Sequence, residues 1–143
     1  MKQQTHAACG IMLASLAVHF YQSDPLITLF WAVFWSLISD FDVYIPTVRH
    51  RGITHTLAFA IFPGAVVLAI WQSHLYAALA SLSVILHLVI DSLNPSGVPL
   101  WLPISTKRVR FPVIGGKVKS DNWLANLIIQ FAAIGAVIRI ILT

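Results

Sequence analysis

The chain of 143 residues has no glutamate, one cysteine and few charged residues of any kind. Charged side chains make up 10% of it, whereas an ordinary soluble domain carries roughly 25%. This small number of charges is not enough for the surface of a water-soluble globular protein. Together with the mean hydropathy of +0.83, the composition therefore predicts a membrane protein. The low charge argues against a disordered chain, a coiled coil and a nucleic-acid-binding module. The lone Cys9 excludes an intramolecular disulfide framework and a cysteine-rich zinc site.

Five apolar stretches predict an all-α bundle of about five transmembrane helices, with residues 1–143 forming one domain. The stretches cover residues 7–21, 26–39, 56–72, 75–91 and 123–142. Only the last reaches the ~20 residues of a comfortable span, so the first two either tilt, re-enter the membrane or extend into their polar flanks. The first stretch carries His19 at its far end instead of a small-residue cleavage site, so we expect it to be retained.

The basic residues favour one orientation in the membrane. If the amino terminus is cytoplasmic and five helices alternate, eight of the nine Lys and Arg residues lie on the cytoplasmic side. Only Arg139 then lies outside, together with the carboxy terminus. The eight are Lys2, Arg49, Arg51, Lys107, Arg108, Arg110, Lys117 and Lys119, the last five within the loop 92–122.

This topology gathers seven His and Asp residues from four chain segments at the cytoplasmic face. An ionisable group at a membrane is costly unless paired or functional, so the gathering predicts a shared site. Imidazoles and carboxylates together are usual ligands of zinc, iron or manganese. His87 and Asp91, four residues apart, project from the same side of a helix. The seven residues are His6, Asp40, Asp42, His50, His55, His87 and Asp91.

Each of these residues taken alone has a simpler interpretation. A single histidine in an apolar segment is more often a core or interfacial residue, and a His–Asp pair four residues apart can be a structural hydrogen bond. Asp40 and Asp42 also fit a helix end and a turn, while Arg49 and Arg51 also fit topology anchors. The coincidence of four segments at one depth favours a metal site.

Several motifs resemble the YdjM-like family, small inner-membrane proteins predicted to be metal-dependent hydrolases. The resemblance implies a multi-pass protein of the cell inner membrane, and the topology inferred from the basic residues places its site on the cytoplasmic side. The motifs are Ser39-Asp40-Phe41-Asp42, His50-Arg51-Gly52-Ile53-Thr54-His55, His87-x3-Asp91, Asn94-Pro95-Ser96-Gly97 and the start His6-x3-Gly10.

More remotely, the order of these residues is similar to the helical zinc-dependent phospholipase C and single-strand nuclease group. That similarity implies a metal held by Asp40 or Asp42 with the other ligands His55, His87 and Asp91. It also implies a second metal held by His6 and Asp91. The third zinc site of that group needs a Glu and further His residues, which are missing after His87, so one or two ions are the limit.

A hydrolase acting at the level of the lipid headgroups is the leading hypothesis. Its cofactor is a divalent metal, with zinc favoured over manganese and iron, that makes water nucleophilic. Asp40 or Asp42 is the candidate general base, His50 the candidate proton donor, and Arg51 a candidate for stabilising charge on a phosphate or carbonyl oxygen. The predicted substrate is a lipid-like ester or phosphoester, whose anionic headgroup the basic loop can attract.

Two other functions compete with hydrolysis. One is metal binding or ion transport, because intramembrane His and Asp residues also mark ion pathways. The far halves of the apolar stretches are nearly free of polar groups, which weighs against a path through the membrane. The other is a non-catalytic structural or regulatory protein, in which the His and Asp residues stabilise the bundle. The oligomeric state has no signature in the sequence.

Overall fold

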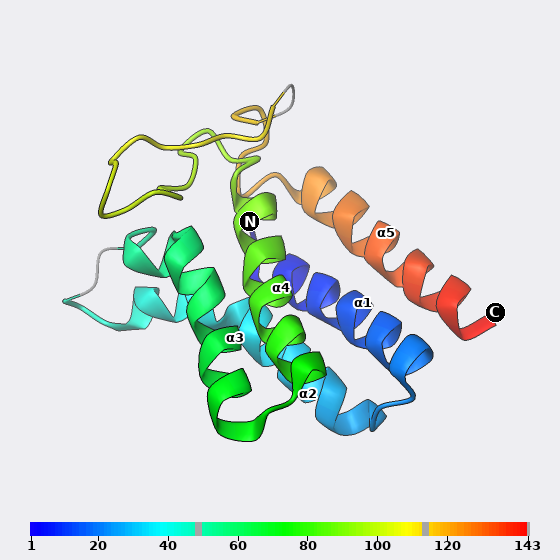
Figure 1. Cartoon of the computed structure of the whole chain (residues 1–143). Coiled ribbons are helices and arrows are strands. Elements are labelled where there is room, and N and C mark those ends of the chain that lie inside the picture. The colour runs from blue at the N-terminus through cyan, green and yellow to red at the C-terminus, as the bar shows by residue number, and fades with distance from the viewer. Residues whose placement is uncertain (48–49, 113–114, 143) are drawn as a thin grey trace.

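The computed structural model describes residues 1–47, 50–112 and 115–142, which form a bundle of helices (Figure 1). Within these residues no β-strand forms, and Val98 and Val109 pair only as an isolated bridge in the long loop. The predicted all-α class is therefore confirmed. The helices are α1 (Gln3–Tyr21), α2 (Pro25–Leu37), α3 (Leu57–Trp71), α4 (His74–Asp91) and α5 (Trp123–Leu142), with the 3-10 helices η1 (Ile38–Tyr44) and η2 (Ile53–His55).

Three of the helical segments are long and apolar enough to cross a membrane. They are α2 continued by η1 (Pro25–Tyr44), α4 and α5. Extension into the polar flanks was one of the alternatives for the short stretch 26–39, and η1 extends α2 in this way. α3 is apolar but has only 15 residues, and α1 has 19 because it begins at Gln3, before the predicted stretch. The described residues thus form five α-helices, and three helical segments among them have the length and composition of membrane spans.

Local sequence signals set the helix ends. The side chains of Asp24, Thr56 and Ser73 accept hydrogen bonds from backbone N–H groups in the first turns of α2, α3 and α4. α1 and α3 both stop at a glutamine in the left-handed conformation, Gln22 at φ 51° and Gln72 at φ 52°. The connections that follow are only a few residues long, so consecutive helices pack antiparallel.

Small residues let the helices approach closely where they cross. A Cβ added to Gly10 of α1 would lie 2.7 Å from Ser36 Oγ of α2, and one added to Gly64 of α3 would lie 2.8 Å from the carbonyl oxygen of Ala77 on α4. Close backbone packing of this kind is the usual means of helix association in a membrane. The Gly10 crossing holds α1 against the stretch of α2 that leads into η1.

Polarity is distributed as expected for a bundle surrounded by lipid. Large apolar side chains such as Leu26, Phe30, Phe62 and Ile141 are exposed on the outside of the helices, while three histidines and three aspartates are buried: His6, His55, His87, Asp40, Asp42 and Asp91. These buried polar residues lie at the end of the bundle where α1 and α5 begin and α4 ends. The long loop lies over the same end, and the carboxy terminus lies at the other (Figure 1).

Candidate metal centre

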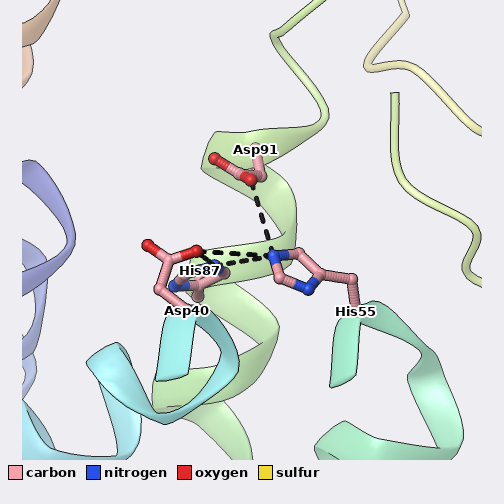
Figure 2. A group of neighbouring side chains, drawn as sticks. All are labelled: Asp40, His55, His87 and Asp91. Carbon is pink, nitrogen blue, oxygen red and sulfur yellow. Dashed lines mark hydrogen bonds and ion pairs between the residues drawn. The ribbon is translucent and has the colours of Figure 1, made fainter. Parts of the chain in front are cut away.

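Four buried side chains from three helical elements converge at the loop end of the bundle (Figure 2). Asp40 comes from η1, His55 from η2, and His87 and Asp91 from the last turns of α4. Each offers one ligand atom, and the four atoms all lie within 4.8 Å of one another. We call these four residues the His–Asp cluster.

The spacing within the His–Asp cluster fits a small divalent cation. His55 Nε2 lies 3.3 Å from His87 Nε2 and 3.6 Å from both Asp40 Oδ1 and Asp91 Oδ2. His87 Nε2 lies 3.5 Å from Asp40 Oδ1. Four tetrahedral bonds of about 2.0–2.1 Å to zinc would separate the ligand atoms by about 3.3 Å. Two imidazoles and two carboxylates at these distances therefore match a zinc-type ligand set.

Hydrogen bonds on the far side of each imidazole turn its Nε2 toward the cluster. His87 Nδ1 lies 2.8 Å from the backbone carbonyl oxygen of Ser36, to which its N–H can donate. His55 Nδ1 lies 3.0 Å from Thr54 Oγ1, which in turn donates to Asp42 Oδ2. A partner of this kind selects the tautomer whose other nitrogen carries a lone pair for a metal.

The two carboxylates also control the charge of His55. Burial alone would lower the pKa of the imidazole, but the contacts with Asp40 and Asp91 outweigh it and hold the pKa above its usual value. The cluster thus favours a cation between its carboxylates. A metal ion would displace that proton, because both require the same Nε2 lone pair.

Asp42 is the one predicted ligand that points away from the cluster. Its Oδ1 lies 2.7 Å from His50 Nδ1, and its Oδ2 accepts hydrogen bonds from Thr54 Oγ1 and from the backbone N–H of Arg51 at 3.1 Å. The same Oδ2 lies 3.5 Å from His55 Nδ1. Both carboxylate oxygens of Asp42 are therefore engaged in hydrogen bonds behind His55, where they support the imidazole.

His6 lies beside the cluster, on the side of the carboxylates away from His55. Its Nε2 is 3.3 Å from Asp91 Oδ1 and 4.0 Å from Asp40 Oδ2, and its ring stacks on His87 with 3.8 Å between the centroids. The imidazole is fully buried, and neither ring nitrogen has a hydrogen-bond partner among the described residues. The amino group of Met1 also pairs with Asp91 Oδ1.

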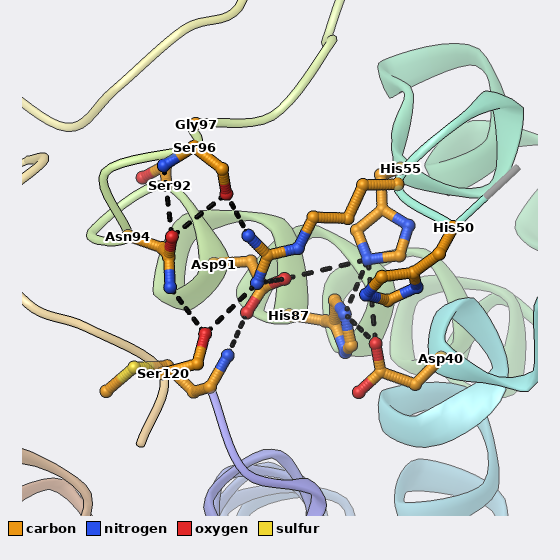
Figure 3. A network of polar contacts seen from close by, with 12 residues as sticks. Asp40, His50, His55, His87, Asp91, Ser92, Asn94, Ser96, Gly97 and Ser120 are labelled. Carbon is orange, nitrogen blue, oxygen red and sulfur yellow. Dashed lines mark hydrogen bonds and ion pairs between the residues drawn. The ribbon is translucent and has the colours of Figure 1, made fainter. Parts of the chain in front are cut away.

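The two remaining predicted residues, His50 and Arg51, lie at the rim of the cluster, and Figure 3 shows His50 beside His55. The side chain of His50 is 46% exposed, whereas that of Arg51 is only 12% exposed. Arg51 has the left-handed backbone conformation, with φ 57°, and its Nη2 lies 2.9 Å from Asp91 Oδ2. Its guanidinium also donates to the hydroxyls of Ser96 and Ser120.

Sequence reasoning missed the serine and asparagine contacts that hold this arginine. Asn94 Oδ1 accepts hydrogen bonds from the backbone N–H and the hydroxyl of Ser96, and Asn94 Nδ2 donates to Ser120 Oγ. The motif Asn94-Pro95-Ser96-Gly97 signals two of these residues. Nothing in the sequence around Ser120 signals the third, because it meets Arg51 only through the fold of the long loop.

Two basic residues of the long loop donate hydrogen bonds to the turn formed by residues 94–97. Arg110 Nε donates to the carbonyl oxygen of Pro95 at 2.9 Å, and Arg108 Nη1 donates to that of Gly97 at 3.4 Å. Their guanidinium groups therefore lie near the rim that holds Arg51. Arg49, a predicted topology anchor, lies outside the described residues.

One comparison with known proteins finds a relationship. The model of the YdjM inner membrane protein family matches residues 1–142, which confirms the resemblance predicted from the motifs. No curated protein and no solved structure matches the chain.

Proposed function

The chain belongs to the family of YdjM inner membrane proteins, and from this premise we propose that it is a membrane-bound, metal-dependent hydrolase. The observation that carries the proposal is the His–Asp cluster, whose four ligand atoms are spaced to hold one divalent ion. The balance of two imidazoles and two carboxylates favours zinc, while manganese and iron accept the same ligand types. The family and the three candidate spans support a location in the membrane.

The residues around the ion have separate tasks in this proposal. When bound, a divalent cation lowers the pKa of a water molecule and polarises an ester or phosphoester oxygen. Asp40 presents Oδ1 to the imidazoles of His55 and His87, which leaves Oδ2 to accept a proton from the attacking water.

Two residues at the rim of the cluster, His50 and Arg51, are assigned proton donation and charge stabilisation. His50 binds Asp42 through Nδ1, so its Nε2 remains to give a proton to the leaving group. Arg51 carries a positive charge next to the cluster and can stabilise negative charge on a substrate oxygen. Its contacts with Ser96 and Ser120 hold the guanidinium in place before substrate arrives.

His6 supports the proposal that a second ion is bound. Asp91 turns Oδ2 toward His55 and Oδ1 toward His6, so its two oxygens could serve one ion each. The buried imidazole of His6, whose ring nitrogens have no hydrogen-bond partner among the described residues, would then complete the second position. One or two ions per chain are the expected stoichiometry.

We expect the site to face the cytoplasm, with the amino terminus inside and the carboxy terminus outside. The positive-inside rule supports this orientation, because the basic long loop lies over the end of the bundle where α4 ends (Figure 1), and the last turns of α4 carry His87 and Asp91 of the cluster. Reporter domains fused after Ser73 and after Thr143 should both report a position outside the cytoplasm. A cytoplasmic signal from either fusion would reverse or break the proposed topology.

Metal content and hydrolysis measured together test the function. Protein purified in detergent should contain one or two equivalents of a divalent metal by elemental analysis and should hydrolyse a phospholipid or a chromogenic phosphodiester. A chelator should remove both metal and activity, and added zinc should restore them, because both depend on the same buried ligands. Protein that binds no metal under any of these conditions would rule the hydrolase out.

A further inference from the structure

An apolar groove of about 500 Å³ runs along α2 and η1 toward the metal centre. It begins at Leu26, near the start of α2, and ends at Phe41, while Ile11 of α1 forms part of one wall. Phe41 is half-exposed and stands in the chain directly between Asp40 and Asp42. One end of the groove is therefore formed by a residue that directly follows Asp40 and precedes Asp42 in η1.

The dimensions and the lining of the groove suit one hydrocarbon chain. Leu26 and Phe41 are 15 positions apart, which corresponds to about 22 Å at 1.5 Å per helical residue. Half the hydrocarbon thickness of a bilayer is about 15 Å, so an acyl chain from the adjoining leaflet fits this length. The residues that line the groove are exclusively Ile, Leu, Val and Phe, so nothing in it opposes an apolar chain.

The rim of the metal centre carries charge of the opposite sign to a phosphate. Arg51 lies against the cluster, and Arg108 and Arg110 are hydrogen-bonded to the turn that holds it. An anionic group placed there would meet several guanidinium groups, which bind phosphate well through paired N–H donors. An apolar groove that leads to a cationic rim matches the polarity of a phospholipid.

Two other apolar hollows of similar size lack this continuity. One of about 550 Å³ is lined by residues near the junction of α1 and α2 and by the end of α5, including His19 and Ile141. Another of about 390 Å³ lies between α1 and the start of α4, around His74 and Leu82. Both adjoin the end of the bundle opposite the metal centre, so a chain bound there would not place its headgroup at the cluster.

We propose that the groove along α2 holds one acyl chain of an anionic phospholipid whose phosphate lies at the metal centre. The inference rests on the proposed hydrolase function and specifies its substrate as a long-chain membrane lipid. Recognition of the chain by the groove then distinguishes this substrate from a soluble phosphate ester, which would meet the same cationic rim but leave the groove unused.

Lipid binding can be measured without hydrolysis by native mass spectrometry of the detergent-purified full chain. The wild type should retain one long-chain phosphatidylglycerol and should bind the short-chain form much more weakly. Val33→Trp, in the middle of the groove, should weaken long-chain binding about tenfold or more, since it fills the space of the chain. Leu82→Trp, an equally bulky change in the hollow beside α4, should bind as the wild type does.

Metal content and melting temperature separate a filled groove from a misfolded protein. Val33→Trp should keep both at wild-type values. If Val33→Trp is misfolded, Leu29→Trp in the same groove replaces it in the comparison. Equal long-chain binding by the groove variant and the wild type would overturn the proposal. Absence of hydrolysis in the wild type would instead overturn the hydrolase and leave the binding comparison intact.

Discussion

Replacing His87 with alanine is expected to remove the bound metal and to abolish hydrolysis. His87 Nε2 lies 3.3 Å from His55 Nε2 and 3.5 Å from Asp40 Oδ1, so it faces two other ligands at once. Loss of a residue that only supports a metal ligand already costs 10–100-fold in affinity, and loss of the ligand itself should exceed about 100-fold. Elemental analysis and a hydrolysis assay of the same purified sample measure both effects.

A matched control is available on the same helix. His74 is the first residue of α4 and lies at the end of the bundle away from the cluster, so His74→Ala should keep both metal and activity. His87→Gln preserves more of the side-chain volume and checks that the alanine variant does not lose metal through unfolding. Full metal occupancy in folded His87→Ala would remove this residue from the ligand set.

Hydropathy and charge were sufficient to predict which residues would meet. Apolar helices that cross in alternating directions bring the residues at every second helix boundary to one end of the bundle. His6, Asp40, His55 and the His87–Asp91 pair follow this rule, and their side chains do lie together. The spacing of four within α4 predicted correctly that its two members share a side of the helix.

The polar start of α1 could not be predicted from hydropathy. The predicted stretch began at residue 7, whereas α1 begins at Gln3. The extra turn is stabilised by distant contacts, since Thr5 Oγ1 donates to Asn126 Oδ1 of α5 at 2.7 Å and accepts from Gln130 Nε2 at 3.0 Å. Such bonds between segments far apart in sequence have no local signature.

The different positions of Asp40 and Asp42 also depend on structure that the sequence left open. Both belong to an Asp-x-Asp motif, and either was a candidate ligand or general base. They lie in a 3-10 helix of three residues per turn, so positions two apart project from different sides. Asp40 therefore faces His55 and His87, while Asp42 faces His50 and Thr54.

This difference predicts that Asp42→Asn weakens metal binding without removing a site. Asp42 holds His55 through Thr54 and holds His50 directly, so the neutral amide should lower zinc affinity 10–100-fold. Hydrolysis at saturating zinc should also fall, by roughly 10²-fold or more, because His50 loses the carboxylate that orients it as a proton donor. Zinc titration by calorimetry and an assay at saturating zinc measure the two effects.

Asp40→Asn supplies the contrasting result. Loss of a ligand of the His–Asp cluster should reduce the amount of bound metal even at saturating zinc. Asp121→Asn, an exposed carboxylate at the end of the long loop, removes the same charge elsewhere and should change neither measurement. If Asp42→Asn instead loses a whole equivalent of zinc at saturation, Asp42 is itself a ligand and the supporting role inferred from its hydrogen bonds is wrong. The number of ions at saturation, more than the affinity, therefore distinguishes a carboxylate that binds the metal from one that holds its histidines.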